Sequence, residues 1–294
     1  MRIGVSSVVV NELAVATGGS LTAVPMPVTA AVAVPLGGRA FADLESFLQA
    51  VDIVTVASPA TFHVAPAMSA IAAGKHVYVE KPIGVRVAEA ERLGAAAAAK
   101  SLVLACGHQE RVVFQAMGLL DIRTPPLLLE AIRHGPPSPR SQDVSAVLDL
   151  MIHDIDLLLT VAGSDPVTAE GEGSLGPNGV WDQARAEITF EGGLTAILDV
   201  SRLAPERRRT MRIVYPAGEV EVDFVARTFR NTTPYTLNAD FADSPAATDP
   251  LGASLDGFLL AVRGEALRPI VTAGEAIAAL DLALAVEQAL ENAA

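Results

Sequence analysis

The sequence predicts an α/β region with a doubly wound parallel sheet, followed by an α+β region with an antiparallel sheet. Three observations support this prediction. Short apolar runs alternate with helical patterns in the first part of the chain, which is typical of parallel βαβ units. Later segments alternate apolar and polar residues between turns that contain Gly or Pro, as antiparallel strands do. The 294 residues are also long for a single core, so we expect two domains.

The α/β region is expected to end near residue 115. Its strands are short and apolar, as strands buried on both faces of a sheet are. The predicted elements are strands over residues 2–5, 52–57, 76–79 and 102–106 and helices over residues 65–73 and 87–100. We therefore assign residues 1–115 to a Rossmann-like nucleotide-binding domain.

The second region, residues 116–294, is expected to be an α+β domain whose C-terminal helices return to the core. Turn signals at Glu191-Gly192-Gly193 and Pro216-Ala217-Gly218 separate the expected strands. The predicted strands cover residues 127–132, 183–190, 194–201, 209–215 and 218–224, and the late helices cover residues 254–263 and 273–292. A helix between the two regions carries Asp149 and His153, where a substrate cleft belongs.

Composition excludes several functional classes. The formal net charge of -13 argues against nucleic acid or an anionic membrane as partner, because both attract clustered Lys and Arg. The short basic stretch 202–209, with four arginines, is a local exception. Cys106 is the one cysteine, which fits a reducing cytoplasm, and its apolar surroundings favour a buried strand residue over a nucleophile. Residues 13–38 are uncharged, but Pro and Gly interrupt them, so no membrane span is expected.

Two motifs carry the chemistry. Lys81, in Tyr78-Val79-Glu80-Lys81-Pro82, follows a predicted strand at the end where open α/β sheets bind ligands. Asp149 and His153 are one helical turn apart and share a face. Either motif alone is also explained by a surface ion pair or a hydrogen bond along a helix. Together, a lysine, an aspartate and a histidine in one cleft can orient a carbinol and remove its proton while a hydride leaves.

In their order and spacing these motifs resemble the glucose-fructose oxidoreductase and inositol dehydrogenase family, Gfo/Idh/MocA. The resemblance covers residues 40–292. It rests on Ser58-Pro59-Ala60-Thr61-Phe62-His63, Ala72-Ala73-Gly74-Lys75-His76-Val77-Tyr78-Val79-Glu80-Lys81-Pro82, Gly107-His108-Gln109-Glu110-Arg111 and Val147-Leu148-Asp149-Leu150-Met151-Ile152-His153-Asp154-Ile155-Asp156. Members that act on nucleotide-linked amino sugars, such as UDP-N-acetylglucosamine 3-dehydrogenases, are the most similar.

The resemblance implies an oxidoreductase that passes a hydride from a sugar or nucleotide-sugar hydroxyl to NAD or NADP. Lys81 would stabilise charge on the reacting oxygen, Asp149 would orient the sugar, and His153 would act as general base. The cofactor side would be lined by Ser58, Pro59, His63, Glu80 and Gln109. His63 could equally be a helix N-terminal residue that faces solvent, and His108 has no clear role. One of Asp154 and Asp156 could hold the second nitrogen of His153. No metal is implied.

The resemblance also bears on assembly and location. One face of the predicted antiparallel sheet needs a cover that the chain's own helices do not provide, and the resemblance suggests a second copy. We therefore expect a cytoplasmic homodimer or homotetramer formed through the C-terminal sheet.

The N-terminus departs from the family. Ser6 and Ser7 follow the first predicted strand in place of the glycines of G-x-G-x-x-G, and no acidic residue is placed to hold a ribose hydroxyl. Three explanations remain open. Ser6 and Ser7 could donate to the phosphates themselves; the protein could be a sugar-binding pseudoenzyme that has lost dinucleotide binding; or residues 6–39 could reflect a shifted reading frame. If residues 6–39 cannot form the glycine turn, we expect residues 8–38 to be the least ordered part of the domain and to hold no intact dinucleotide.

Overall fold

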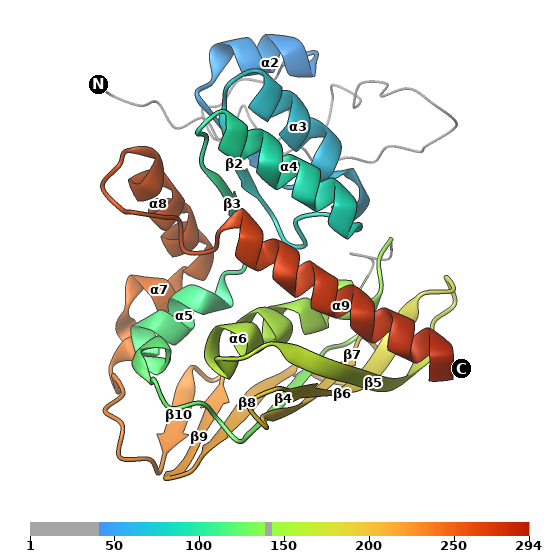
Figure 1. Ribbon diagram of the computed structural model, residues 1–294, viewed down its shortest axis with the longest axis vertical. Coiled ribbons are helices and arrows are strands. Elements are labelled where there is room, and N and C mark those ends of the chain that lie inside the picture. The colour runs from blue at the N-terminus through green and yellow to red at the C-terminus, as the bar shows by residue number, and fades with distance from the viewer. Residues whose placement is uncertain (1–40, 139–142, 294) are drawn as a thin grey trace. The chain divides into compact units, whose positions relative to one another are not determined.

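A computed structural model describes residues 41–138 and 143–293 of the chain (Figure 1). These residues form two compact units, one of residues 41–107 and 257–274 and the other of residues 108–256 and 275–293. Each unit is described separately below. The strand expected over residues 2–5, the proposed phosphate ligands Ser6 and Ser7 and the stretch 8–38 lie outside the described residues.

Among its described residues, the first unit contains a three-stranded parallel sheet in the order β1-β2-β3. Its strands are β1 (Ile53–Val56), β2 (His76–Val79) and β3 (Leu104–Cys106), and its helices are α2 (Leu44–Ala50), the 3-10 turn η2 (Ala60–Phe62), α3 (Val64–Ala72) and α4 (Val87–Ala99). Val77 and Val79 are fully buried, which explains why the strands read as continuous apolar runs. In α4 the small Ala90 and Ala97 face the core. The parallel α/β prediction is confirmed.

Residues 257–274 complete the first unit. They include the end of α8 (Pro250–Val262), where the ring of Phe258 packs 5.8 Å from that of Tyr78. The carbonyl oxygen of Val271 accepts a hydrogen bond of 3.3 Å from the backbone nitrogen of Cys106. Cys106 itself is buried in β3, as the sequence predicts.

The second unit contains a seven-stranded mixed sheet in the order β10-β9-β8-β4-β7-β6-β5. The strands are β4 (Leu128–His134), β5 (Pro166–Leu175), β6 (Trp181–Phe190), β7 (Thr195–Ser201), β8 (Arg208–Tyr215), β9 (Gly218–Asp223) and β10 (Thr228–Asn231). Central β4 runs parallel to β7 and antiparallel to β8. Every other pairing in this sheet is antiparallel, so the predicted α+β fold is confirmed with one parallel pair inside it.

Helices cover one face of this sheet (Figure 1). They are α5 (Glu110–Met117), the π-helical turn η4 (Val147–Met151), α6 (Ile152–Ala162) and α9 (Ala273–Ala293), with η3 (Leu119–Asp121), η5 (Phe241–Asp243) and α7 (Pro245–Thr248) beside them. Alternate residues of β4, Leu129, Ala131 and Arg133, are buried beneath them. None of the described helices is long and apolar enough to cross a membrane.

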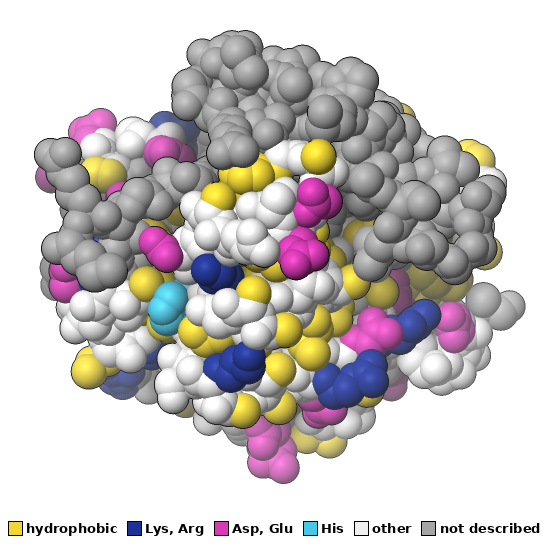
Figure 2. Space-filling view, turned by 90° about the horizontal axis from the view of Figure 1, so that it is seen from above, with side chains coloured by type: hydrophobic (Ala, Val, Ile, Leu, Met, Phe, Trp, Pro, Cys, Tyr) yellow, Lys and Arg dark blue, Asp and Glu magenta, His cyan; other side chains and the backbone are white. Residues whose placement is uncertain are grey.

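On the face shown in Figure 2, acidic and basic side chains lie near one another rather than in separate patches.

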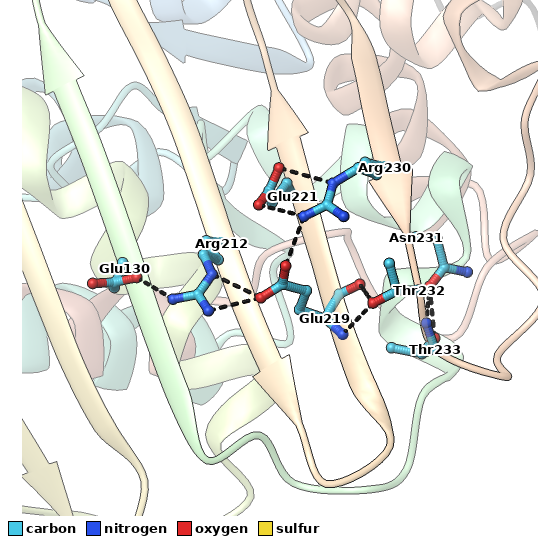
Figure 3. A network of polar contacts seen from close by, with 8 residues as sticks. All are labelled: Glu130, Arg212, Glu219, Glu221, Arg230, Asn231, Thr232 and Thr233. Carbon is cyan, nitrogen blue, oxygen red and sulfur yellow. Dashed lines mark hydrogen bonds and ion pairs between the residues drawn. The ribbon is translucent and has the colours of Figure 1, made fainter.

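The second face of the seven-stranded sheet carries a network of ion pairs (Figure 3). Arg212 bonds Glu130 at 2.6 Å and Glu219 at 2.7 Å, and Arg230 bonds Glu219 at 2.7 Å and Glu221 at 2.8 Å. These side chains project from β4, β8, β9 and β10 away from the buried residues of the same strands. The part of this face that β4, β8, β9 and β10 form is therefore charged. No described helix covers the face in Figure 1.

Candidate active site

The carboxyl edge of the parallel sheet gathers three predicted residues. Ser58, Glu80 and Lys81 follow β1 and β2, and Gly107 follows β3, so all lie at the same edge. The backbone nitrogen of Glu80 donates to Val56 and that of Gly107 to Val79, both at 2.8 Å, which extends the sheet pairing to these positions. This is the edge at which open α/β sheets bind their ligands.

Gly107 gives room to the carboxylate of Glu80. A Cβ atom at position 107 would lie 2.8 Å from Glu80 Oε2 and 3.0 Å from its Cδ, closer than side chains normally approach. The glycine thus allows Glu80 to lie flat against the neighbouring strand end. Lys81, the next residue, is half-buried.

His63 is buried, with 2% of its surface exposed, so the expectation that it could face solvent is wrong. Its Nδ1 lies 2.6 Å from the carbonyl oxygen of Pro82 and its Nε2 lies 2.7 Å from that of Ser58. Both contacts are hydrogen bonds only when both ring nitrogens carry protons, because carbonyl oxygens only accept. His63 therefore joins the loop after β1 to the loop after β2. The ring does not face solvent, because the position of His63 at the start of α3 turns it inward.

In the second unit, His153 at the start of α6 meets Glu110 at the start of α5. Nδ1 of His153 lies 2.6 Å from Glu110 Oε2, and the two side chains are 13% and 15% exposed. An unprotonated nitrogen would repel a carboxylate oxygen at this distance, so Nδ1 carries the proton. With Nδ1 protonated, Nε2 is the ring nitrogen that can take a further proton. This is the arrangement that a general base requires.

Arg133 fixes the position of Glu110. From near the carboxyl end of β4 its guanidinium donates to Glu110 Oε1 at 2.9 Å and to both oxygens of Asp154 at 2.8 and 3.0 Å. Burial opposes the charge on Glu110, but His153 and then Arg133 outweigh it and hold the pKa of that carboxyl well below its ordinary range. Glu110 is therefore a carboxylate at neutral pH.

The two aspartates after His153 have other partners. Asp154 pairs with Arg133, and Asp156 receives two hydrogen bonds from Arg111, of 2.7 and 3.0 Å. The contact to Nδ1 of His153 comes from Glu110, so the expectation that Asp154 or Asp156 holds this nitrogen is wrong. The ring of buried His108 lies 6.5 Å from that of His153.

Asp149 lies on the π-helical turn η4, one turn before His153. The sequence predicts an ordinary helix here; the structure instead widens the helix by one residue at this point. Ser145 supports the turn, because its hydroxyl accepts from the backbone nitrogen of Leu148 at 3.1 Å and its carbonyl from that of Asp149 at 2.9 Å. Widened turns of this kind occur frequently at functional sites.

Comparison with known proteins identifies the family. Residues 22–108 match the family model "Oxidoreductase family, NAD-binding Rossmann fold" and residues 133–221 match the "GFO/IDH/MocA C-terminal domain". UDP-N-acetylglucosamine 3-dehydrogenase from Acidithiobacillus ferrooxidans is 36% identical over 277 residues, which is 90% of this chain and 88% of that protein. The chain belongs to the Gfo/Idh/MocA family.

Solved structures of Gfo/Idh/MocA dehydrogenases agree with this. A structure of UDP-N-acetylglucosamine 3-dehydrogenase GnnA from Acidithiobacillus ferrooxidans matches with a TM-score of 0.84 and 34% identity, over 91% of this chain and 88% of that one. The fold is also that of the WlbA dehydrogenase from Bordetella pertussis in complex with NADH and UDP-GlcNAcA, with a TM-score of 0.78 and 19% identity, over 90% and 85% of the two chains. The family match begins at residue 22, which lies inside the segment 6–39 that could reflect a shifted reading frame.

The described part of the Gfo/Idh/MocA cofactor edge has features that fit a dinucleotide. The hydroxyl of Ser58 is buried and has no hydrogen-bond partner among the described residues, so it can bond a ligand there. Pro59 follows Ser58 and precedes the 3-10 turn η2. The phosphate ligands proposed in the sequence, Ser6 and Ser7, are not among the described residues.

The predicted Gfo/Idh/MocA site residues fall in both units. Lys81, with Ser58, Pro59, His63 and Glu80, belongs to the first unit. The second unit holds Gln109, Asp149 and His153. That Lys81 acts together with Asp149 and His153 stays a prediction. Sequence reasoning did not single out Glu110 or Arg133, although Glu110 stands inside a quoted motif and its charge next to Gln109 was a signal.

Proposed function

We propose that the chain is an NAD(P)-dependent dehydrogenase that oxidises a hydroxyl of a sugar or, more specifically, of a nucleotide sugar. The contact between Glu110 and His153 carries this proposal, because it leaves Nε2 of His153 as a base inside the second unit. The similarity to UDP-N-acetylglucosamine 3-dehydrogenase over 90% of the chain supports the substrate class. The family model supports NAD or NADP as cofactor.

In this proposal each residue has a distinct role. Nε2 of His153 takes the hydroxyl proton, and Glu110 stabilises the imidazolium that results. Asp149 orients the sugar through its hydroxyls. Lys81 stabilises the negative charge that develops on the reacting oxygen. A bound nicotinamide would supply the acceptor for the hydride of the carbon that carries this oxygen.

The test is turnover of UDP-N-acetylglucosamine with NAD and with NADP, followed as absorbance of the reduced nicotinamide. We expect His153→Ala and Lys81→Ala each to lower kcat by about 100-fold or more, since a positioned base contributes about that much. His134→Ala is the matched control, because this half-exposed histidine pairs with Asp199 on the other face of the sheet. Absence of turnover with nucleotide sugars, inositols and aldoses alike contradicts the proposal.

A second function is favoured by the missing glycines after residue 5. A sugar-binding pseudoenzyme would keep the base and its partners but would bind no nicotinamide. Titration with NADH, followed by nicotinamide fluorescence, separates the two. An enhancement that saturates supports the dehydrogenase, whereas sugar binding by calorimetry without any NADH response supports the pseudoenzyme.

A further inference from the structure

A cavity of about 190 Å³ lies beside the base in the second unit. Gln109 and Glu110 from the start of α5 line it together with Arg209 of β8, and Phe224 and Arg227 line it from the loop between β9 and β10. Glu110 is the carboxylate that contacts Nδ1 of His153, so one side chain separates the cavity from the proposed base.

Arg209 gives this cavity its charge. It lies on the helix-covered face of β8, in register with buried Met211 and Ile213, and is half-buried. Burial and then the charge of Arg133 lower the pKa of its guanidinium. No carboxylate lies within ion-pair distance of Arg209 in the part of the chain that the structure describes, unlike Arg111, Arg133 and Arg202. A half-buried guanidinium without an ion pair is costly and is stabilised by an anion from outside.

The surrounding charges leave Arg209 uncompensated. Those that act on it are the arginines Arg133 and Arg207 and the acids Glu110 and Asp154, which balance each other in number. Arg227, which lines the same cavity, adds a second positive charge. Two uncompensated guanidinium groups at one cavity match a ligand that carries two negative charges.

The loop between β9 and β10 holds Arg227 at the cavity. The backbone nitrogen of Phe224 donates to the carbonyl oxygen of Arg209 at 2.9 Å, which ties the loop to β8. The carboxylate of Asp223 accepts from the backbone nitrogens of Val225 and Ala226 at 2.8 and 2.9 Å. Arg227 itself has a φ of 55°, a left-handed conformation that is unfavourable for a residue with a side chain. The loop is thus held in one shape by bonds to its own backbone.

We propose that this cavity is an anion subsite in which Arg209 and Arg227 bind the diphosphate of a nucleotide-linked sugar. The inference rests on the proposed function, because it places the phosphates beside the base that acts on the sugar. Guanidinium groups bind phosphate oxygens with two parallel hydrogen bonds, and the side-chain amide of Gln109 offers a further donor. The volume of the cavity holds the phosphates but not a whole nucleotide sugar, so sugar and nucleoside extend from it on either side.

The test is calorimetric titration of the full chain with UDP alone, without sugar or nicotinamide. We expect saturable binding that weakens as salt rises. Arg209→Met and Arg227→Met should each weaken it at least tenfold, and Arg209→Lys should restore part of the affinity. Arg208→Met is the matched control: it removes the same charge from the neighbouring, exposed position of β8, whose side chain points to the opposite face, and it should bind UDP like the wild type.

The outcomes separate this inference from the proposed function. UDP binding that Arg209→Met leaves unchanged overturns the subsite, even if the enzyme oxidises sugars. UDP binding that depends on Arg209 supports the subsite, even if no sugar is oxidised. If NADP displaces UDP and its own binding also weakens in Arg209→Met, the anion belongs to the cofactor and the diphosphate proposal is wrong. Arg209→Met should fold at least as stably as the wild type, because it relieves repulsion by Arg133. Thermal unfolding checks this stability. If Arg209→Met proves unstable, Arg227→Met tests the subsite in its place.

Discussion

Glu110 determines which nitrogen of His153 is basic. Its oxygen lies 2.6 Å from Nδ1, while Arg133 holds its second oxygen at 2.9 Å. Arg133 also binds both carboxylate oxygens of Asp154, which keeps its guanidinium in place beside Glu110. The reactivity of one imidazole therefore depends on a carboxylate from α5 and a guanidinium from β4.

Glu110→Gln should lower kcat by about 100-fold or more while KM for the sugar changes little. The amide has almost the same shape as the carboxylate, but it does not stabilise the imidazolium and can turn its NH₂ toward Nδ1, which favours the wrong tautomer. Initial rates over a range of substrate concentrations measure both constants. Glu275→Gln, which affects the neighbouring pair with Arg111, is the control. A wild-type kcat in Glu110→Gln would refute the role given to this residue.

Glu110 should also make stability depend on pH. Its pKa in the folded protein is lowered, so its contribution to the free energy of unfolding is complete above its ordinary pKa of about 4.3 and is lost as the pH falls further. Urea unfolding should therefore show Glu110→Gln to be less stable than the wild type at pH 7. The difference should shrink on acidification below pH 4.3. A difference that grows in acid would contradict the lowered pKa.

The sequence shows the proposed reacting groups better than the residues that contact them. Lys81, Asp149 and His153 stand in motifs whose residues are close along the chain. The partner of Asp154, by contrast, is Arg133, 21 positions away, and that of Asp156 is Arg111, 45 positions away. No local period relates such residues, because their contact depends on how α5, α6 and β4 pack.

At the scale of elements, the sequence predicts strands and helices well where the apolar residues follow one clear pattern. The observed bounds of β2 coincide with those predicted, because its apolar run is bounded by turn residues on both sides. The exposed edge strand β5 is not predicted, since Pro166 begins it and glycines interrupt its pattern. The packing explains the glycines: a Cβ at Gly171 would lie 2.9 Å from Leu290 of α9. The parallel pairing of β4 with β7 also escapes sequence reasoning, because register between distant strands leaves no local signal.

Gly107→Ala should weaken NADH binding without unfolding the first unit. The new methyl group would meet the Glu80 carboxylate at 2.8 Å and move it from the edge of the sheet. We expect the Kd for NADH, measured by fluorescence, to rise about tenfold. Gly135→Ala is the control, because a Cβ there meets no atom within 4 Å. Equal NADH affinity in both variants and the wild type would show that Glu80 does not take part in cofactor binding.

At the scale of the molecule, we propose that the uncovered face of the seven-stranded sheet is the surface on which two copies meet. Half-exposed apolar residues, Ile132, Ile197 and Val214 among them, lie on the same face of the sheet as these ion pairs. A face with both charges and apolar residues can pair with a rotated copy of itself, because each acid can then meet a base.

Light scattering at micromolar concentration should give the mass of a dimer or tetramer. Arg212→Glu should reduce this mass to that of one chain, because it places a third carboxylate beside Glu130 and Glu219 and breaks the balance of charge on the face. Arg86→Glu makes the same change of charge at an exposed position of the first unit and should leave the mass unchanged. A wild-type protein that scatters as one chain would contradict the proposed assembly.

The central place of β4 has a consequence for the order in which the chain is made on the ribosome. This strand is synthesised first of the seven, yet its two neighbours end only at Ser201 and Tyr215. Until those residues emerge, the nascent strand exposes its backbone donors and acceptors on both sides, which is the state most prone to pairing with other chains. Glu130 and Arg133 interrupt its apolar residues with charge, and charges within a strand oppose such pairing. The arginine that later holds Glu110 in the folded protein thus protects the same strand before the fold exists.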